Sequence, residues 1–141
     1  MKKQAAILLS AVLLTGCGES SAVSVSQEMQ YIKTSVLYET ITDMYNDPDR
    51  YVGGVYHMVG ILYPSTDDDG ETFYSVYAAE PGDSDHGIGL ELDWPDFSGF
   101  TDYETVTVEG KLDRAETTDK ETGSKYEYLI LRTTLLEKRN Q

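Results

Sequence analysis

The densest run of apolar and aromatic residues extends from Val55 to Tyr63, with Gly60 inside it. Its β-branched and aromatic composition is typical of a buried or half-buried strand. A glycine inside a strand weakens it and usually marks a bulge or a bend at a barrel corner. We therefore expect the first and longest strand of a small barrel, bent at Gly60 so that its two halves pair with different neighbours.

A helix is predicted before this strand, from about Glu28 to Tyr45, with Ser35 as the N-cap of a shorter version. Pro48 disfavours helical geometry in the residue before it, so the helix must end near Asn46. The pair Gly53-Gly54 then lets the backbone turn into the strand. The apolar stripe of the helix, expected to pack on the barrel, consists of Leu37, Ile41, Met44 and Tyr45, and Met29, Ile32 and Val36 would extend it.

Alternating apolar and polar residues predict four further strands after Tyr63. They are Thr72–Ala78, Ile88–Asp93, Thr105–Leu112 and Tyr126–Thr133. Polar or irregular connections separate them at 64–71, 80–87, 94–100 and 115–124, and a basic tail follows the last strand. One helix followed by five closely spaced strands predicts a mainly β protein: a small antiparallel barrel preceded by one N-terminal helix.

The segments VxGIL, GIGLELDWP and VTVEGKLDR resemble the OB-fold, in particular the secreted bacterial OB-fold proteins that carry a helix before the barrel. The resemblance covers about Ser35 to Glu137. It departs from the usual plan because the connection between the third and fourth strands is short and not evidently helical. In OB-folds, the second and third strands and two hairpin loops commonly form the ligand face. Here those loops are 65–71 and 115–124.

The segment SVLYETITDMYNDPDRYVGG is similar to a narrower group, uncharacterised bacterial lipoproteins with the pattern M-x-N-P-x-x-Y-x-G before a strand. That group often carries cysteines where this chain has Pro81 to Gly87. Both alternating sets of the first strand are apolar, so its pattern leaves open which set faces the barrel interior. The resemblance implies that Tyr56, Met58 and Leu62 point inward.

The first residues read as a leader rather than as part of the fold. Two lysines, a ten-residue apolar run from Ala5 to Leu14 and the sequence Leu14-Thr15-Gly16-Cys17 follow one another. This sequence resembles the bacterial lipobox, which implies cleavage after Gly16 and a lipid on Cys17. We therefore expect a lipoprotein signal peptide at 1–16, a flexible tether at 17–27 and a helix-plus-barrel domain at 28–141. The expected location is the extracytoplasmic face of the cell membrane.

Loss of the leader would remove two lysines and leave 9 of the 11 Lys and Arg residues against 25 Asp and Glu, a formal charge of −16. Such a surface repels nucleic-acid phosphates and anionic lipid headgroups. Nucleic acid is therefore not an expected partner, and the lipid must provide the membrane attachment.

The candidate ligand face consists of Phe73, Tyr77 and Glu91. Aromatic rings beside carboxylates suit sugars or cationic peptides. The alternative is that the 11 tyrosines and the single tryptophan simply cover a small barrel.

Asp67, Asp68, Asp69 and Glu71 form the best candidate for a metal site, with Ca²⁺ as its ion, although an acidic tight turn is the commoner explanation for such a cluster. His57 and His86 are too few for a structural zinc site, and a two-histidine catalytic site would need Asp83 or Asp85. No other cofactor is predicted.

No serine lies in a nucleophile elbow, and no pair of carboxylates is set in a recognisable cleft pattern. We therefore expect a non-catalytic binding module for a protein partner or a small ligand. Two alternatives stay open, namely an accessory subunit of an envelope complex and a carboxylate-dependent hydrolase.

Overall fold

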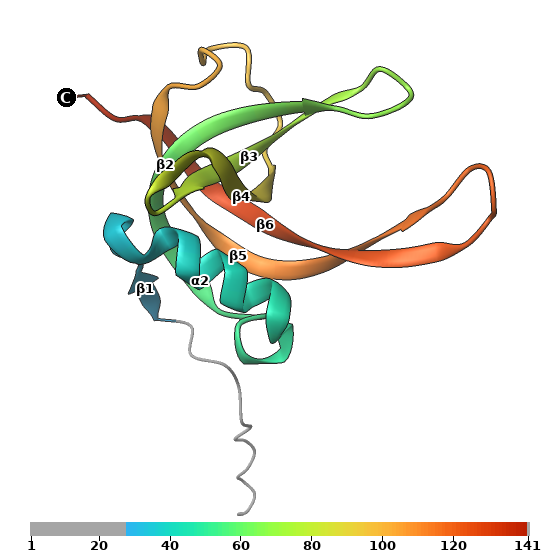
Figure 1. Ribbon diagram of the computed structural model, residues 1–141, viewed down its shortest axis with the longest axis horizontal. Coiled ribbons are helices and arrows are strands. Elements are labelled where there is room, and N and C mark those ends of the chain that lie inside the picture. The colour runs from blue at the N-terminus through green and yellow to red at the C-terminus, as the bar shows by residue number, and fades with distance from the viewer. Residues whose placement is uncertain (1–27, 141) are drawn as a thin grey trace, which may run out of the picture.

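The computed structural model describes residues 28–140 and shows a closed five-stranded barrel preceded by one α-helix (Figure 1). The predicted fold class is confirmed. The predicted signal peptide, Cys17 and the tether lie outside the described residues. Within 28–140, no helix is both long enough and apolar enough to cross a membrane.

The barrel is formed by β2 to β6 in the spatial order β2-β3-β4-β6-β5, and pairing between β2 and β5 closes it. Only β4 and β6 are parallel to each other within the barrel. This arrangement is OB-like. The strands are β2 (Val55–Thr66), β3 (Thr72–Glu80), β4 (Asp83–Asp93), β5 (Thr105–Thr118) and β6 (Lys125–Lys138).

The predicted helix begins later than expected. Residues Met29–Tyr31 form a short strand, β1, parallel to β2, and a 3-10 turn, η3 (Thr34–Val36), leads into α2 (Leu37–Asn46). Ser35 lies in the 3-10 turn and does not cap α2, whose N-cap position is Val36 and carries no side-chain hydrogen bond. Pairing with the exposed edge of β2 satisfies the backbone of β1, so tertiary contacts override the apolar spacing that favoured a longer helix.

Helix α2 covers one end of the barrel with Leu37, Ile41 and Met44, which are fully buried. It ends at Asn46 as predicted, and a second 3-10 turn, η4 (Pro48–Arg50), follows. Gly53 has φ 94°, the left-handed geometry that only glycine adopts at low cost, so the predicted glycine turn into β2 is confirmed.

Tyr56, Met58 and Leu62 of β2 are fully buried, so the orientation implied by the lipoprotein resemblance is confirmed. Strand β2 pairs with β5 up to Ile61 and with β3 from Ile61 onward, so its two halves have different neighbours, as predicted. Gly60 lies at this change but forms no bulge. A Cβ there would lie 2.8 Å from Cγ2 of Val76, so close packing in a narrow barrel requires the glycine.

The strands extend well beyond the barrel, further than predicted. Residues 64–66, 83–87, 115–118 and 134–138 belong to strands, although the first three segments were predicted as loops and the last as a tail. The β2–β3 and β5–β6 hairpins therefore project as two long arms on the same side of the molecule (Figure 1). Both faces of an isolated arm meet water, so their sequences are polar and lack the alternation that marks a half-buried strand.

Candidate functional site

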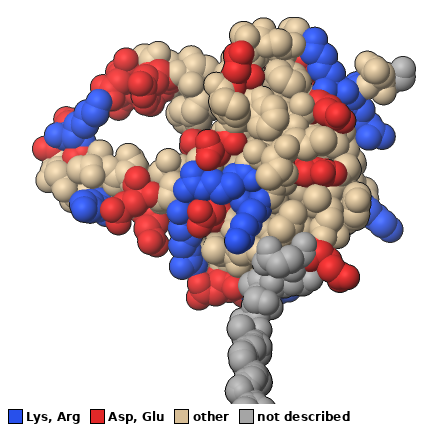
Figure 2. Space-filling model, turned by 180° about the vertical axis from the view of Figure 1, so that it is seen from behind, with Lys and Arg blue, Asp and Glu red and all other residues tan. Residues whose placement is uncertain are grey.

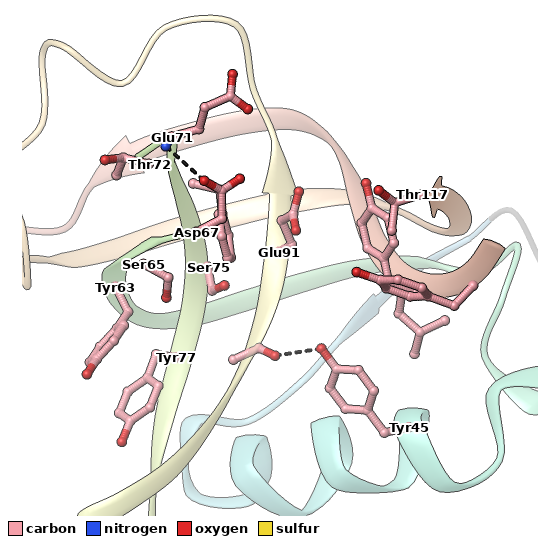
Figure 3. A pocket seen from close by; sticks show the side chains of 15 residues that line it. Tyr45, Tyr63, Ser65, Asp67, Glu71, Thr72, Ser75, Tyr77, Glu91 and Thr117 are labelled. Atoms are coloured by element: carbon pink, nitrogen blue, oxygen red, sulfur yellow. Dashed lines mark hydrogen bonds between the residues drawn. The ribbon is translucent and has the colours of Figure 1, made fainter. Parts of the chain in front are cut away.

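A cleft of about 1040 Å³ lies between the two hairpin arms, against the outer face of β3 and β4 (Figure 3). Of the fifteen residues that line it, none is Lys or Arg. The aromatic lining residues are Tyr45, Tyr63, Phe73, Tyr77, Tyr126 and Tyr128. The acidic ones are Asp67, Glu71 and Glu91. The three residues of the predicted ligand face, Phe73, Tyr77 and Glu91, thus lie together on the walls of one cleft.

Strand alternation places the β3 side chains. Val76 points into the barrel and is fully buried, so Phe73, Ser75 and Tyr77 face outward into the cleft. Two outward positions of β4 are glycines, namely Gly89 opposite Tyr77 and Gly87 opposite Ala79. A Cβ on Gly87 would overlap the ring of Tyr77, and one on Gly89 would lie 2.9 Å from Cβ of Ser75. The alternating glycines of β4 therefore make room for the cleft floor.

Three tyrosines pack together at one side of the cleft. The rings of Tyr63 and Tyr77 stack with their centroids 4.6 Å apart, and Tyr103 approaches Tyr63 edge-on at 5.4 Å. Tyr103 is the only described non-glycine residue with positive φ, 71°. A tyrosine in this left-handed region is uncommon and strained. Its backbone N–H donates to the carbonyl of Leu62, which holds the strained turn against β2.

Tyr45 of α2 also enters the cleft, where its hydroxyl donates to the carbonyl oxygen of Gly89 at 2.8 Å (Figure 3). Helical spacing predicted Tyr45 as part of the apolar stripe together with Met44, but Tyr45 lies at the edge of that stripe and is half-exposed. Burial, and to a smaller extent the negative charge of Glu91, raise the pKa of the Tyr45 phenol.

Glu91 carries the partly buried negative charge of the cleft floor. Burial, and secondarily repulsion by Asp93, raise the pKa of its carboxyl group above the ordinary glutamate value. The phenol of Tyr128 on β6 has a raised pKa for the same kind of reason, first burial and then the charge of Glu91. A positively charged group placed here would lower the pKa values of both groups, because it favours the ionised form of a neighbouring acid.

The β5–β6 arm contributes Tyr126 and Tyr128, which the sequence analysis did not assign to the site. They alternate with Glu127, so both rings project from the same face of β6. The sequence signal was present in the pattern Tyr-Glu-Tyr. The pattern does not show on which side of the hairpin the two rings lie, because neither face of a projecting hairpin is apolar enough to define an interior.

The two arms meet at their ends. Nζ of Lys120 in the β5–β6 turn lies 2.5 Å from Oδ2 of Asp69 in the β2–β3 turn. Seen from behind, the arms enclose an opening (Figure 2). The cleft is therefore bounded by the barrel at its base and by this ion pair at its tip.

The acidic loop is organised as a turn. Oδ1 of Asp67 accepts hydrogen bonds from the backbone N–H groups of Asp69 and Glu71, both at 2.9 Å, and Asp69 pairs with Lys120. Within residues 28–140, no three His, Cys, Asp or Glu side chains come together to hold a metal ion. The predicted set of Asp67, Asp68, Asp69 and Glu71 is therefore not assembled as a metal site.

The two histidines lie apart from the cleft lining and have different partners. Nδ1 of His57 lies 2.7 Å from Oε2 of Glu109 on the outer surface of the barrel, where the ring of Tyr31 packs against the imidazole at a tilt of 37°. Nδ1 of His86 lies 2.7 Å from Oδ2 of Asp83 in the β3–β4 hairpin. His86 thus lies beside one of the two aspartates considered for it, but His57 does not join them.

The sequence matches no protein-family model, and none of the curated proteins is similar enough to it to indicate a relationship.

Proposed function

We propose that this protein is a lipid-anchored, non-catalytic binding module that holds its ligand in the cleft between the β2–β3 and β5–β6 arms. The observation that carries the proposal is the composition of this cleft, six aromatic rings and three carboxylates with no basic side chain. Most of these rings lie on the outer face of the strands and are not part of the barrel core, so their apolar area is available to a ligand.

The glycines of β4 support the same proposal. Gly87 and Gly89 leave room that the ring of Tyr77 and the side chain of Ser75 occupy. Glycine in the interior of a strand costs stability, because it adds backbone entropy to the unfolded chain and contributes no packing. A cost accepted in order to seat an outward-facing tyrosine ring against β4 supports a role for this aromatic surface in binding.

The anchoring part of the proposal rests on the lipobox-like sequence ending at Cys17. Ten residues of tether at full extension would reach roughly 35 Å, enough to hold the barrel clear of the bilayer surface. Mass spectrometry of the protein from its own cells tests this part. We expect loss of residues 1–16 and a diacylglycerol on Cys17. An intact leader or an unmodified Cys17 would contradict it.

Thermal unfolding of the purified intact chain tests the binding part. The ligand panel comprises cationic peptides and neutral oligosaccharides. A ligand at about 100 times its Kd stabilises the native state by roughly 2.7 kcal/mol, which appears as a clear rise in the midpoint. The double variant Phe73→Ala/Tyr126→Ala should abolish the rise, and both side chains are exposed enough that their loss leaves the fold intact.

Tyr31→Ala is the matched control, since Tyr31 is the most exposed large hydrophobic residue within 28–140 and lies outside the cleft. A ligand-induced rise that survives in the Phe73/Tyr126 double variant but is lost in the Tyr31 variant would place the site elsewhere and overturn the proposal.

A further inference from the structure

Strand β6 has an unpaired edge within the cleft. It pairs with β5 along nearly its whole length, but with β4 only at residues 130–132. In the described part of the chain, Lys125–Leu129 therefore has a strand neighbour on one side only. Three residues of this segment, Tyr126, Tyr128 and Leu129, line the cleft. An exposed row of backbone N–H and C=O groups is a template on which another extended chain can pair.

The edge of β4 that faces this segment of β6 is covered. There, the hydroxyl of Tyr45 donates to the carbonyl of Gly89, and helix α2 packs against the strand. Covering a strand edge with a helix is one of the ways in which proteins protect it. The fold thus covers one side of the gap between β4 and β6 and leaves the other side, Lys125–Leu129, available.

The charges around this edge select one kind of partner. Every charged side chain that lines the cleft is acidic, namely Asp67, Glu71 and Glu91. The two lysines nearest the tip of the β5–β6 hairpin already have acidic partners, because Lys120 pairs with Asp69 and Lys125 lies 3.8 Å from Glu116. The cleft therefore presents negative charge beside aromatic faces, which attract Lys and Arg side chains.

We infer that the ligand is an extended, basic polypeptide segment that adds to the Lys125–Leu129 edge of β6 as an extra strand. Alternate basic side chains of the segment point toward Glu91 and the tyrosine rings. This inference rests on the proposed function of the cleft and names the class of ligand. A neutral sugar would use the rings but neither the strand edge nor the carboxylates, and a nucleic acid would be repelled by them.

The test measures the affinity of the intact chain, purified in detergent, for fluorescent eight-residue peptides by anisotropy. The first peptide alternates Lys and Val, and a second replaces every Lys with Glu. Two more peptides keep the Lys-Val sequence but carry N-methyl groups on either the odd or the even backbone amides. Only one set of amides in an added strand faces β6, so one N-methyl peptide should bind about tenfold more weakly and the other should not.

Site variants add a second readout. Glu91→Gln should weaken binding of the Lys-Val peptide about threefold, and raised salt should weaken it further. Glu137→Gln, the same change at an exposed position of β6 outside the cleft, should leave the affinity unchanged. The Glu-Val peptide should not bind.

The outcomes separate the inference from the proposed function. Equal affinity of the two N-methyl peptides would overturn strand addition, and binding of the Glu-Val peptide would overturn the charge requirement. Suppose that cellohexaose binds, that Phe73→Ala/Tyr126→Ala abolishes this binding, and that the Lys-Val peptide does not bind. The inferred class of ligand, a basic peptide, is then wrong, but the cleft remains the binding site. If the double variant changes the binding of no probe, both the inferred class of ligand and the proposed binding site are wrong.

Discussion

Asp69 and Lys120, 51 residues apart in the chain, join the tips of the two hairpin arms through an ion pair. Each residue lies in the turn of its own hairpin, and both are largely exposed to water. The pair closes the cleft at its tip, so the arms are linked at both ends, by the barrel and by this contact. Surface ion pairs contribute little to global stability, so the effect of this one is on the separation and mobility of the arms.

We predict that Lys120→Ala leaves the thermal midpoint nearly unchanged but raises the mobility of both tips. The measurement is amide relaxation of Gly70 and Gly123, which lie in the two turns. Lys138→Ala, an exposed lysine away from the tips, is the control and should change neither amide. Unchanged relaxation at both glycines would show that the ion pair does not hold the arms together.

Gly60→Ala should destabilise the protein by about 1–3 kcal/mol, because overpacking a tight core forces neighbouring atoms apart. The added Cβ would lie 2.8 Å from Cγ2 of Val76 and 2.9 Å from the carbonyl oxygen of Tyr77. Gly99→Ala is the matched control, since a Cβ there meets no atom within 4 Å. Denaturant unfolding of the two variants checks this, and equal stabilities would contradict the packing account.

Tyr103 allows a test of backbone strain that is separate from its ring. Tyr103→Gly and Tyr103→Ala both remove the edge-on contact with Tyr63, but only glycine accepts φ 71° without a steric penalty. We therefore expect the glycine variant to be more stable than the alanine variant by about 1 kcal/mol. Chemical unfolding measures the difference. If the alanine variant is the more stable one, the left-handed geometry at this position is not maintained in solution.

The raised pKa of Glu91 predicts two opposite pH effects. The carboxyl group of Glu91 holds its proton more tightly in the folded state than in the unfolded state. The contribution of Glu91 to stability is therefore most favourable below the pKa of the unfolded state, and it declines as pH rises through the higher pKa of the folded state. Affinity for a cationic peptide changes in the other direction, because protonation removes the charge that the peptide contacts. It should fall as pH decreases through the raised pKa.

An NMR titration of the Glu91 carboxyl carbon, with peptide affinity measured at the same pH values, checks this prediction. The midpoint should lie above 4.5, the ordinary value, and Glu91→Gln should flatten the affinity profile in that range. A midpoint at or below the ordinary value would contradict the partial burial of this side chain.

The barrel was predictable because its strands and turns are marked by patterns of residues that are close together in the sequence. The strand cores alternate clearly, and Pro48 and Gly53-Gly54 fix where the helix ends and β2 begins. The start of α2 was not predictable in the same way. The segment that precedes it carries apolar residues at helical spacing, yet Met29–Tyr31 pairs with β2, and a pairing between segments so far apart is absent from any local pattern.

The candidate site was predictable only in part, for a related reason. Phe73, Tyr77 and Glu91 stand on β3 and β4, whose opposite faces are core, so alternation fixed their direction. Tyr126 and Tyr128 stand on a projecting arm with no core face, so alternation gave no direction. Tyr45 was assigned to the apolar stripe because it follows Ile41 by four residues, and only the placement of α2 beside β4 leaves Tyr45 half-exposed while Met44 is buried.

Amide NMR of the intact chain in detergent, during titration with the Lys-Val peptide and with cellohexaose, locates the ligand site residue by residue. We predict that the largest shifts fall on residues 72–77, 89–91 and 125–129, on the walls of one cleft. Largest shifts on the far side of the barrel, around His57 and Glu109, or no shift with either probe, would contradict this prediction.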